Sequence, residues 1–293
     1  CDGDSTSLAA CAKHFVGYGA AESGRDYNST NIPERQMRNV YLPPFKAAID
    51  AGAMTLMTSF NDNDGIPATG NKGLVYDLLR QEWGFDGMVV TDWNSAGEMI
   101  AHGFAQDGKD AAMKAINAGV DMDMMSYTFT GNLAQLIDEG KVSQKRLDEA
   151  VRNILKLKFR LGLFDNPYTR KGAVEEVTYC DNHLEAAYQT ALESAILLKN
   201  DGTLPLSEQK LQHIVVAGPK ADAPYEQLGT WAFDGQKEHT ITPLDAIRKE
   251  LGSKVDVTYD NILSYSRQKV SERELMAFGK RAKRADAILL FLG

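Results

Sequence analysis

The sequence has few cysteines, no long apolar run and no excess of positive charge. Its three cysteines, Cys1, Cys11 and Cys180, are an odd number at wide spacing, which supports neither a disulfide framework nor a zinc site. No run of about eighteen apolar residues could span a bilayer, and no basic-then-apolar leader begins the sequence, so any signal peptide would lie upstream. We therefore expect no metal and no membrane-spanning segment.

The charge balance argues against a nucleic-acid partner. The chain has 32 Lys and Arg residues against 40 Asp and Glu residues, a net charge of -8, and no stretch concentrates the basic residues. Proteins that bind nucleic acid or anionic membranes carry a clustered basic surface, which is missing here. With 43% hydrophobic and 25% charged residues, the composition is that of an ordinary globular protein of about two domains. We expect a neutral or polar small molecule as partner, with no nucleic acid and no membrane.

Strand-like and helix-like segments alternate through the first 165 residues. Apolar segments of strand character cover 8–15, 53–59, 87–91 and 120–125. Segments of helical periodicity cover 33–52, with a break at Pro43 and Pro44, then 72–83, 107–119 and 143–161. Strands regularly separated by helices predict right-handed βαβ units and a parallel sheet, either as an eight-stranded barrel or as an open doubly wound sheet.

Functional residue types recur where these strand-like segments end, and this favours the barrel. The strand ends carry Lys13 and His14, then Met57 and Phe60, then Asp92 and Trp93, and finally Asp121 and Asp123. In a barrel the carboxyl ends of all strands converge on one face, where the active site is assembled. The pattern therefore predicts one cleft that gathers side chains from all four segments.

Each of these residues also has a purely structural interpretation. Asp92 could cap the next helix or begin a turn, but the adjacent Trp93 offers a rigid apolar wall that suits stacking against a sugar ring. Lysine is almost never fully buried without a partner, so Lys13 beside a histidine at a strand end favours a site over the core. For Asp121 and Asp123 the favoured interpretation is that of turn or sheet-rim residues.

Several motifs, in order and with matching spacing, resemble those of glycoside hydrolase family 3, especially its bacterial β-glucosidases. The motifs are KHFVGYG at 13–19, GRDYN at 24–28, MTSFNDNDGIPATGN at 57–71, GFDGMVVTDW at 84–93, AGVDMDM at 118–124, RNILKLKFRLGLFDNPY at 152–168 and ALESAILLKNDGTLPL at 191–206. The resemblance implies a (β/α)8 TIM-type barrel followed by an α/β/α sandwich. It also implies that no cofactor is needed.

The resemblance assigns roles to individual residues. Asp92 would be the catalytic nucleophile. The hydroxyls of the sugar would be bound by Lys13, His14 and Arg25, and the sugar pocket would be shaped by Met57, Phe60 and Trp93. Phe60 stands where many members of the family have a tyrosine, so a hydrogen bond from that phenol is absent.

The reaction implied by this resemblance is the hydrolysis of terminal non-reducing β-D-glucosyl residues by a retaining, exo-acting β-glycosidase. Such an enzyme needs two carboxyl groups about 5 Å apart, one that attacks the anomeric carbon and one that protonates the leaving oxygen. Asp92 would supply the first and form a covalent glycosyl-aspartate. The second is expected beyond Gly293, because the family's usual acid/base is a glutamate of the second domain that follows a strand like 285–293.

The predicted domain organisation has three parts. Residues 1–165 would form the second half of the barrel, 166–200 a linker and connecting helix, and 201–293 the first part of the sandwich. The last part contains strand-like segments at 213–218, 255–259 and 287–292, and a helix capped by Thr242 and begun by Pro243. We expect the chain to be incomplete at both ends, so flanking segments of the same protein would complete the two domains.

Other functions remain open. The alternatives are a β-xylosidase or another β-glycosidase of the same family, and a non-catalytic sugar-binding relative without a working acid/base. A nucleotide-binding enzyme is disfavoured, because no glycine loop that could cradle phosphates precedes a helix. We expect a periplasmic or secreted location, with a cytoplasmic one left open, and a homodimer is left open as well.

Overall fold

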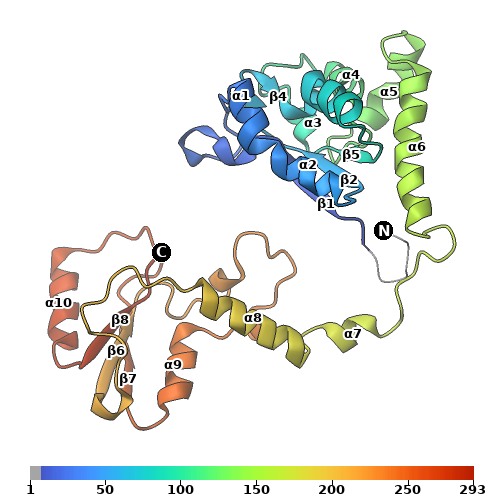
Figure 1. Ribbon diagram of the computed structural model, residues 1–293. Coiled ribbons are helices and arrows are strands. Elements are labelled where there is room, and N and C mark those ends of the chain that lie inside the picture. Colours follow the sequence, from blue (N-terminus) through green and yellow to red (C-terminus); the bar gives the residue numbers. More distant parts are fainter. Residues whose placement is uncertain (1–7) are drawn as a thin grey trace. The chain divides into compact units, whose positions relative to one another are not determined.

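The computed structural model describes residues 8–293, and the chain divides into two units between Thr178 and Tyr179 (Figure 1). This division lies within 166–200, the segment that the sequence assigns to a linker and connecting helix. Each unit contains a parallel sheet of its own. The candidate site belongs to the first unit.

The first sheet consists of β1 (Cys11–Phe15), β2 (Thr55–Thr58) and β5 (Met88–Val90), in the order β1-β2-β5 with parallel neighbours. These strands confirm three of the four strand-like segments. The fourth prediction, a strand over 120–125, is wrong, because the chain there makes only a single bridge between Val90 and Met122. The backbone turns away soon afterwards, where Met125 and Tyr127 have positive φ angles of 68° and 57°.

β1 carries an irregularity at the position of the KH motif. Ala12 pairs with Leu56 and Phe15 pairs with Thr58, so β1 has one more residue than β2 between these two pairs. The extra residue falls in the stretch that contains Lys13 and His14. A bulge of this kind bends the strand and turns its side chains in a new direction. It therefore decides how these two residues leave the sheet.

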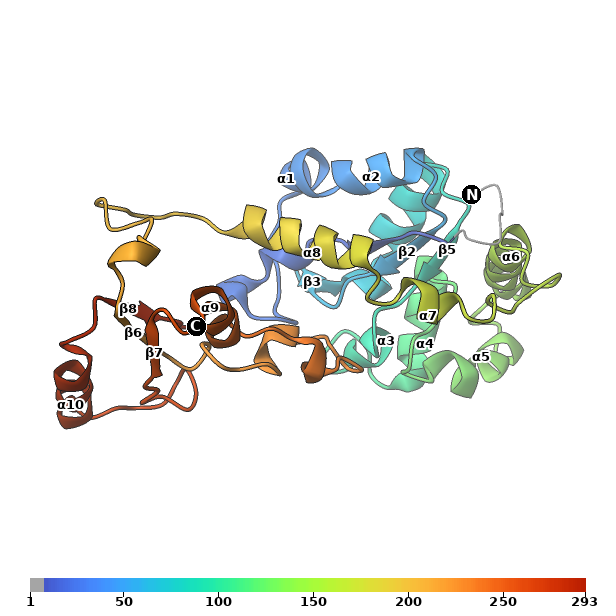
Figure 2. The same ribbon diagram turned by 90° about the horizontal axis from the view of Figure 1, so that it is seen from below.

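Helical segments follow the strands as βαβ topology requires. The α- and π-helical ones in the first unit are α1 (Glu34–Gln36), the π-helical η3 (Met37–Tyr41), α2 (Pro43–Asp50), the π-helical η5 (Gly73–Glu82), α3 (Ser95–Glu98), α4 (Gly108–Ala118), α5 (Thr128–Asp138), α6 (Gln144–Arg160) and α7 (Ala173–Val177). Short 3-10 turns are η1 (Tyr18–Ala20), η2 (Glu22–Gly24) and η4 (Ala68–Gly70). Figure 2 shows α1 and α2 running along the same side of the unit.

Several helix boundaries follow the local sequence signals. The predicted break at Pro43 is where α2 begins, because proline suits the first turn of a helix. Asp107 caps α4 through a 2.8 Å hydrogen bond from the Asp110 N–H, and Gly119 ends it with a φ of 109°. Ser143 caps α6 in the same way. The sequence analysis did not predict α5.

A single hydrophobic core joins the sheet to these helices. Phe15, Leu56 and Val89 each supply a fully buried side chain from a different strand, and they pack with Leu79 of η5 and Ile116 of α4. Full burial of a side chain of this size stabilises the fold by about 1.5–3 kcal/mol. The core therefore holds the three strand ends rigidly with respect to each other.

A short hairpin follows β2 and lies beside the site. Its strands are β3 (Asp62–Asn63) and β4 (Ile66–Pro67), joined by Asp64 and Gly65 with φ angles of 53° and 78°. Positive φ at both central residues is typical of the tight turns that Asp-Gly sequences favour. The Asp62 carboxylate accepts the Gly65 N–H at 2.9 Å, which fixes the turn.

Asp121 anchors the amino end of the sheet. Its buried carboxylate accepts hydrogen bonds from Arg80 at 2.5 Å, from Arg146 at 2.9 Å and from the Val89 N–H at 2.9 Å. The Asn153 amide lies 3.2 Å from both oxygens. Asp121 thus ties η5, α6 and β5 together, as the structural interpretation of this residue favoured.

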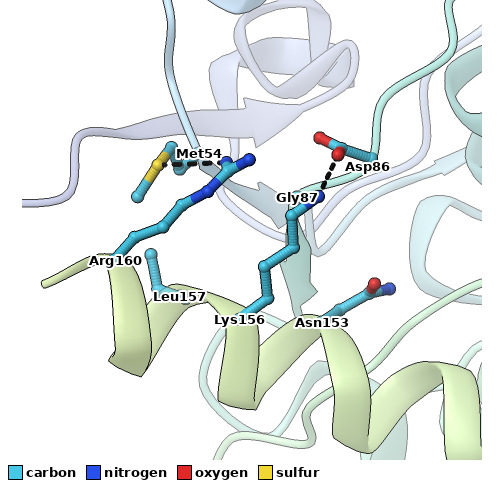
Figure 3. Close-up of a pocket in the computed structure, with 7 residues that line it drawn as sticks. All are labelled: Met54, Asp86, Gly87, Asn153, Lys156, Leu157 and Arg160. Carbon is cyan, nitrogen blue, oxygen red and sulfur yellow. Dashed lines mark hydrogen bonds and ion pairs between the residues drawn. The ribbon is translucent and has the colours of Figure 1, made fainter. Parts of the chain in front are cut away.

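Figure 3 shows a second set of contacts at this amino end, where α6 faces the residues that precede β2 and β5. Lys156 forms an ion pair with Asp86, and the Arg160 guanidinium lies 3.5 Å from the Met54 sulfur. The hydrogen bond from Lys156 is the main reason why the pKa of Asp86 is lowered. Charged groups at this end are thus matched with partners from the protein itself.

The second unit contains β6 (His213–Ala217), β7 (Asp256–Tyr259) and β8 (Ala287–Leu290), with β6 central and parallel to both neighbours. All three strands confirm predicted segments. Figure 1 shows α9 (Pro243–Leu251) and α10 (Glu272–Ala282) on opposite sides of this sheet. Thr242 caps α9 as predicted. The sequence analysis did not predict α10, although Ser271 and Glu274 form a capping box at its start.

The connection before this sheet contains α8 (Asp181–Ser194), the helix expected from Asp181 onward. The stretch 196–199 that follows is neither helix nor strand. No helix within residues 8–293 combines the length and the apolar character needed to cross a bilayer. Cys11 and Cys180 are free thiols, while Cys1 lies outside the described residues.

Candidate active site

Asp92 follows the carboxyl end of β5, where the chain leaves the core, and is only 8% exposed. Its Oδ1 accepts the Trp93 backbone N–H at 2.7 Å. Its Oδ2 lies 3.2 Å from His14 Nε2 but accepts no well-aligned hydrogen bond from the described part of the chain. One carboxylate oxygen is therefore held in place, while the other is buried beside the His14 imidazole without a well-aligned donor among residues 8–293.

Buried hydroxyl groups fix the backbone on both sides of Asp92. The fully buried Thr91 side chain accepts the Met124 N–H at 2.8 Å. At the start of α3, Ser95 Oγ lies 2.8 Å from Thr69 Oγ1, which in turn lies 2.9 Å from Thr58 Oγ1. These contacts join the ends of β2 and β5 to the segment that follows the nucleophile candidate.

His14 reaches Asp92 from the bulge in β1. Burial lowers the pKa of His14 below its usual value, and this effect outweighs the Asp92 carboxylate, which raises it. The Lys13 ammonium lowers the pKa further and the Asp26 carboxylate raises it. The imidazole is therefore neutral at pH 7, and it can donate only one N–H, so its orientation decides whether that donor faces Asp92.

Lys13 lies in β1, and Arg25 lies in the loop that follows β1. Both residues are exposed, and neither side chain makes a hydrogen bond or ion pair with any other residue in 8–293. Lys13 is close enough to His14 to affect its pKa. Cationic donors without protein partners are available for the hydroxyls of a ligand.

Aromatic side chains surround the end of β2. Phe60 is buried, and its ring centroid lies 4.5 Å from that of Tyr27 and 6.0 Å from that of Tyr18. Trp93 is 59% exposed, so its indole presents a free face. Met57, half-buried, pairs with Val90 on β5. The structure thus brings His14 and Asp92 into contact and places Lys13, Met57, Phe60 and Trp93 at neighbouring strand ends.

A cavity of about 340 Å³ lies on this side of the unit, lined by Tyr27, Glu98, Ala101 and His102. Burial raises the pKa of Glu98, and the charges of Asp92 and Asp26 raise it further. The sequence analysis did not single out these residues. Two sequence features could have pointed to them: Tyr27 lies within the GRDYN motif, and Glu98 and His102 have the i, i+4 spacing of one helix face.

His102 has a fixed orientation within this lining. Its Nδ1 lies 3.3 Å from Asp62 Oδ1, the oxygen that also accepts a 2.7 Å hydrogen bond from Ser29. Asp123, by contrast, accepts the backbone N–H groups of Thr128 and Phe129 at 2.8 and 3.2 Å. It therefore acts as the cap of α5, in line with the turn role favoured by the sequence.

Comparison with solved structures finds close relatives. The β-glucosidase from Listeria innocua in complex with glucose is 40% identical, with a TM-score of 0.86 over 98% of this chain and 38% of that chain. The periplasmic β-glucosidase of Salmonella typhimurium is 38% identical over 262 residues, 87% of this chain. A β-xylosidase of Formosa agariphila is 34% identical over 307 residues, 99% of this chain.

Both units match models of known domains. Residues 4–157 match the glycosyl hydrolase family 3 N terminal domain, and residues 195–293 match the glycosyl hydrolase family 3 C-terminal domain. The chain spans 34% and 42% of the length of the two curated relatives. Together with the structural relatives, these matches confirm the predicted fold class, a TIM-type barrel followed by a sandwich domain. With both domain models matched in order, the chain belongs to glycoside hydrolase family 3.

Proposed function

We propose that the protein is a retaining, exo-acting β-glycosidase that releases terminal β-D-glucosyl residues, with Asp92 as nucleophile. The observation that carries this proposal is the state of the Asp92 carboxylate. It is buried at a strand end, one oxygen is fixed by the Trp93 N–H, and the other has no well-aligned donor among residues 8–293. A nucleophile needs to be held rigidly, and an oxygen that accepts no well-aligned hydrogen bond keeps its lone pairs available for attack.

In the proposed first step, Asp92 Oδ2 forms a bond to the anomeric carbon while the bond from that carbon to the leaving oxygen breaks. The leaving oxygen takes a proton from a second carboxylic acid. That group, now a carboxylate, then removes a proton from water, and the resulting attack on the glycosyl-aspartate restores free Asp92. Configuration at the anomeric carbon is retained because it is inverted twice.

The remaining predicted residues would hold the sugar during these steps. Lys13 and Arg25 would donate to its hydroxyls, because their charged groups lack partners among residues 8–293. His14 would keep its contact with the nucleophile. Phe60 and the exposed indole of Trp93 would supply apolar surface against the ring. Fixed orientation of a substrate against its nucleophile can remove several kcal/mol of a barrier.

The relatives support a β-glucoside as substrate and keep a β-xyloside as the second candidate. The structural relative holds glucose, whereas the relative that aligns over 99% of this chain is named a β-xylosidase. The two sugars differ at carbon 5, where glucose carries a hydroxymethyl group. The ratio of kcat/KM for 4-nitrophenyl β-D-glucoside and β-D-xyloside therefore decides between them, and we expect the glucoside to be preferred.

The proposed location is the periplasm or the cell exterior, supported by the periplasmic relative. Fractionation of the native host followed by immunodetection tests it.

The proposed domains are 1–165 for the barrel part and 201–293 for the sandwich part, joined through 166–200. Limited proteolysis of the full-length protein should then cleave within 166–200 in preference to either flanking part.

The stereochemical outcome tests the proposed reaction. Proton NMR of the full-length protein acting on an aryl β-glucoside should show the β-anomer of glucose first, with the α-anomer appearing only through slow mutarotation. Initial release of the α-anomer would exclude a covalent intermediate on Asp92. Asp138→Asn is a matched control for substitutions of Asp92, because Asp138 is exposed at the end of α5 and outside the site.

A further inference from the structure

The His14 imidazole, which contacts Asp92, packs against the ring of Tyr18. The ring centroid of Tyr18 lies 4.7 Å from that of His14, with an angle of 34° between the planes. Tyr18 follows His14 by only four residues, so the chain has to turn sharply between them. Gly17 allows this turn with a φ of 94°, and a Cβ at this position would approach Ile32 Cδ1 to 2.9 Å.

Tyr18 is itself held at two further points. Its hydroxyl donates a hydrogen bond to Asp26 Oδ1, and its ring packs against Phe60 at the end of β2. Asp26 is fixed in turn, because the same oxygen accepts the Tyr27 N–H at 3.1 Å. The phenol stays protonated, since burial and the bond to Asp26 both raise the pKa of Tyr18. The ring therefore has one preferred position.

The orientation of the imidazole matters because His14 is neutral and has a single N–H. A rotation about its side chain that moved Nε2 away from Asp92 would break the one ion-pair contact that Asp92 makes with a basic side chain within residues 8–293. The charged groups that act on His14 are Asp92 after β5, Lys13 beside it and Asp26 from the loop after β1. Tyr18 is the aromatic ring that packs against its face.

We propose that Tyr18 and Asp26 are positioning residues, a phenol–carboxylate clamp that holds His14 against the nucleophile Asp92. This inference rests on the proposed function, because it assumes that the contact between His14 and Asp92 serves catalysis. Neither residue needs to touch the substrate. Both act through His14, and this dependence makes the proposal testable.

A double-mutant cycle in the full-length protein measures the dependence. Tyr18→Phe keeps the ring and removes the hydrogen bond to Asp26, and we expect kcat on 4-nitrophenyl β-D-glucoside to fall on the order of 10-fold. In a His14→Ala background the same substitution should change kcat less than about 2-fold, because the group it positions is gone. Tyr76→Phe on η5, away from the site, should match the wild type in both backgrounds.

An effect of Tyr18→Phe that is equal in both backgrounds would overturn the proposal, because Tyr18 would then act independently of His14. No effect in the wild-type background would also overturn it. Asp26→Asn provides a second route if Tyr18→Phe lowers the thermal stability. In the wild-type background Asp26→Asn should lower kcat, and in the His14→Ala background it should change kcat less than about 2-fold. An equal effect in both backgrounds would contradict the clamp.

A crystal structure of the Tyr18→Leu variant gives a readout that does not need activity. If Tyr18 holds the imidazole in place, the His14 ring should turn in this variant, so that Nε2 and Asp92 Oδ2 separate beyond hydrogen-bond distance. An unchanged ring would overturn the positioning role even in a protein that hydrolyses β-glucosides. If the wild-type protein hydrolyses no β-glycoside, the proposed function fails, while the position of His14 in this variant still decides on the clamp.

Discussion

Charged residues at the two ends of the first sheet differ in whether they have partners within the protein. At the amino end, Asp121 is surrounded by Arg80, Arg146 and Asn153, and Asp86 has Lys156. At the carboxyl end, the second oxygen of Asp92 lies beside the neutral His14 imidazole, and the nearby Lys13 ammonium has no partner within residues 8–293. Paired charges hold elements together. Unpaired ones at a rigid position are available for a ligand, so the comparison separates structural from functional residues of the same chemical type.

The largest expected effect is on turnover at the carboxyl end. Asp92→Asn should reduce kcat on an aryl β-glucoside by about 10⁴-fold or more, or about 5 kcal/mol of barrier, because the amide cannot attack carbon. Thermal stability should stay unchanged, since the amide is nearly isosteric and the Trp93 N–H still finds an oxygen. If the variant retained a tenth of the activity, Asp92 would be a binding residue, and the contrast between the two ends would lose its functional meaning.

At the amino end the corresponding substitution should act on stability. Asp121→Asn leaves two guanidinium groups without their buried counter-charge, and breaking such a pair costs about 3–5 kcal/mol. Urea denaturation of the full-length protein measures this loss against the Asp138→Asn control. An Asp121→Asn protein that is as stable as the control would show that the paired end is not a structural anchor.

A smaller effect with a defined pH dependence is expected for Glu98. Its pKa is raised in the folded protein, so its ionisation works against folding, and the stability that its protonated form provides is lost as the pH rises through that pKa. Glu98→Gln should therefore raise the melting temperature at pH 7 and lose this advantage near pH 4. A variant that is less stable than the wild type at pH 7 would reveal an undetected partner of Glu98.

The smallest effect is expected for the exposed pair at the amino end. Asp86 is 69% exposed, and ion pairs at such positions contribute roughly 0–1 kcal/mol. Lys156→Ala should lower the melting temperature slightly at pH 7. Because the pKa of Asp86 is lowered, this contribution is present above its unfolded value and is lost as the pH falls through the folded value. A loss of stability as large as that for Asp121→Asn would show that the contacts drawn in Figure 3 form a second structural anchor.

Sequence reasoning located the elements of the site better than its internal geometry. The strands that contain Lys13 and Met57 and the strand that leads to Asp92 were readable because apolar runs stop at polar or aromatic residues. The bulge in β1 was not readable, since it results from the register between two strands that are far apart in the sequence. The same holds for Asp121, whose arginine partners lie 41 and 25 residues away without any local signal.

Two errors show how local signals compete. The segment 120–125 has the alternation of a strand, but Asp123 caps α5 and the chain turns before a second strand pair can form. In the second unit, α10 was overlooked although Ser271 and Glu274 are spaced as a capping box. The first error required knowledge of tertiary contacts. The second signal was present in the sequence.

Covalent trapping tests the central claim that Asp92 attacks the sugar. A 2-deoxy-2-fluoro-β-glucoside with a good leaving group should form the glycosyl-enzyme at a useful rate and slow its hydrolysis, so that the intermediate accumulates in the full-length protein. Peptide mapping by mass spectrometry should then place one fluoroglucosyl group on the peptide that contains VVTDWN, at Asp92, and the Asp92→Asn protein should remain unlabelled. A label on another carboxylate, such as Asp26 or Glu98, would contradict the assignment of the nucleophile.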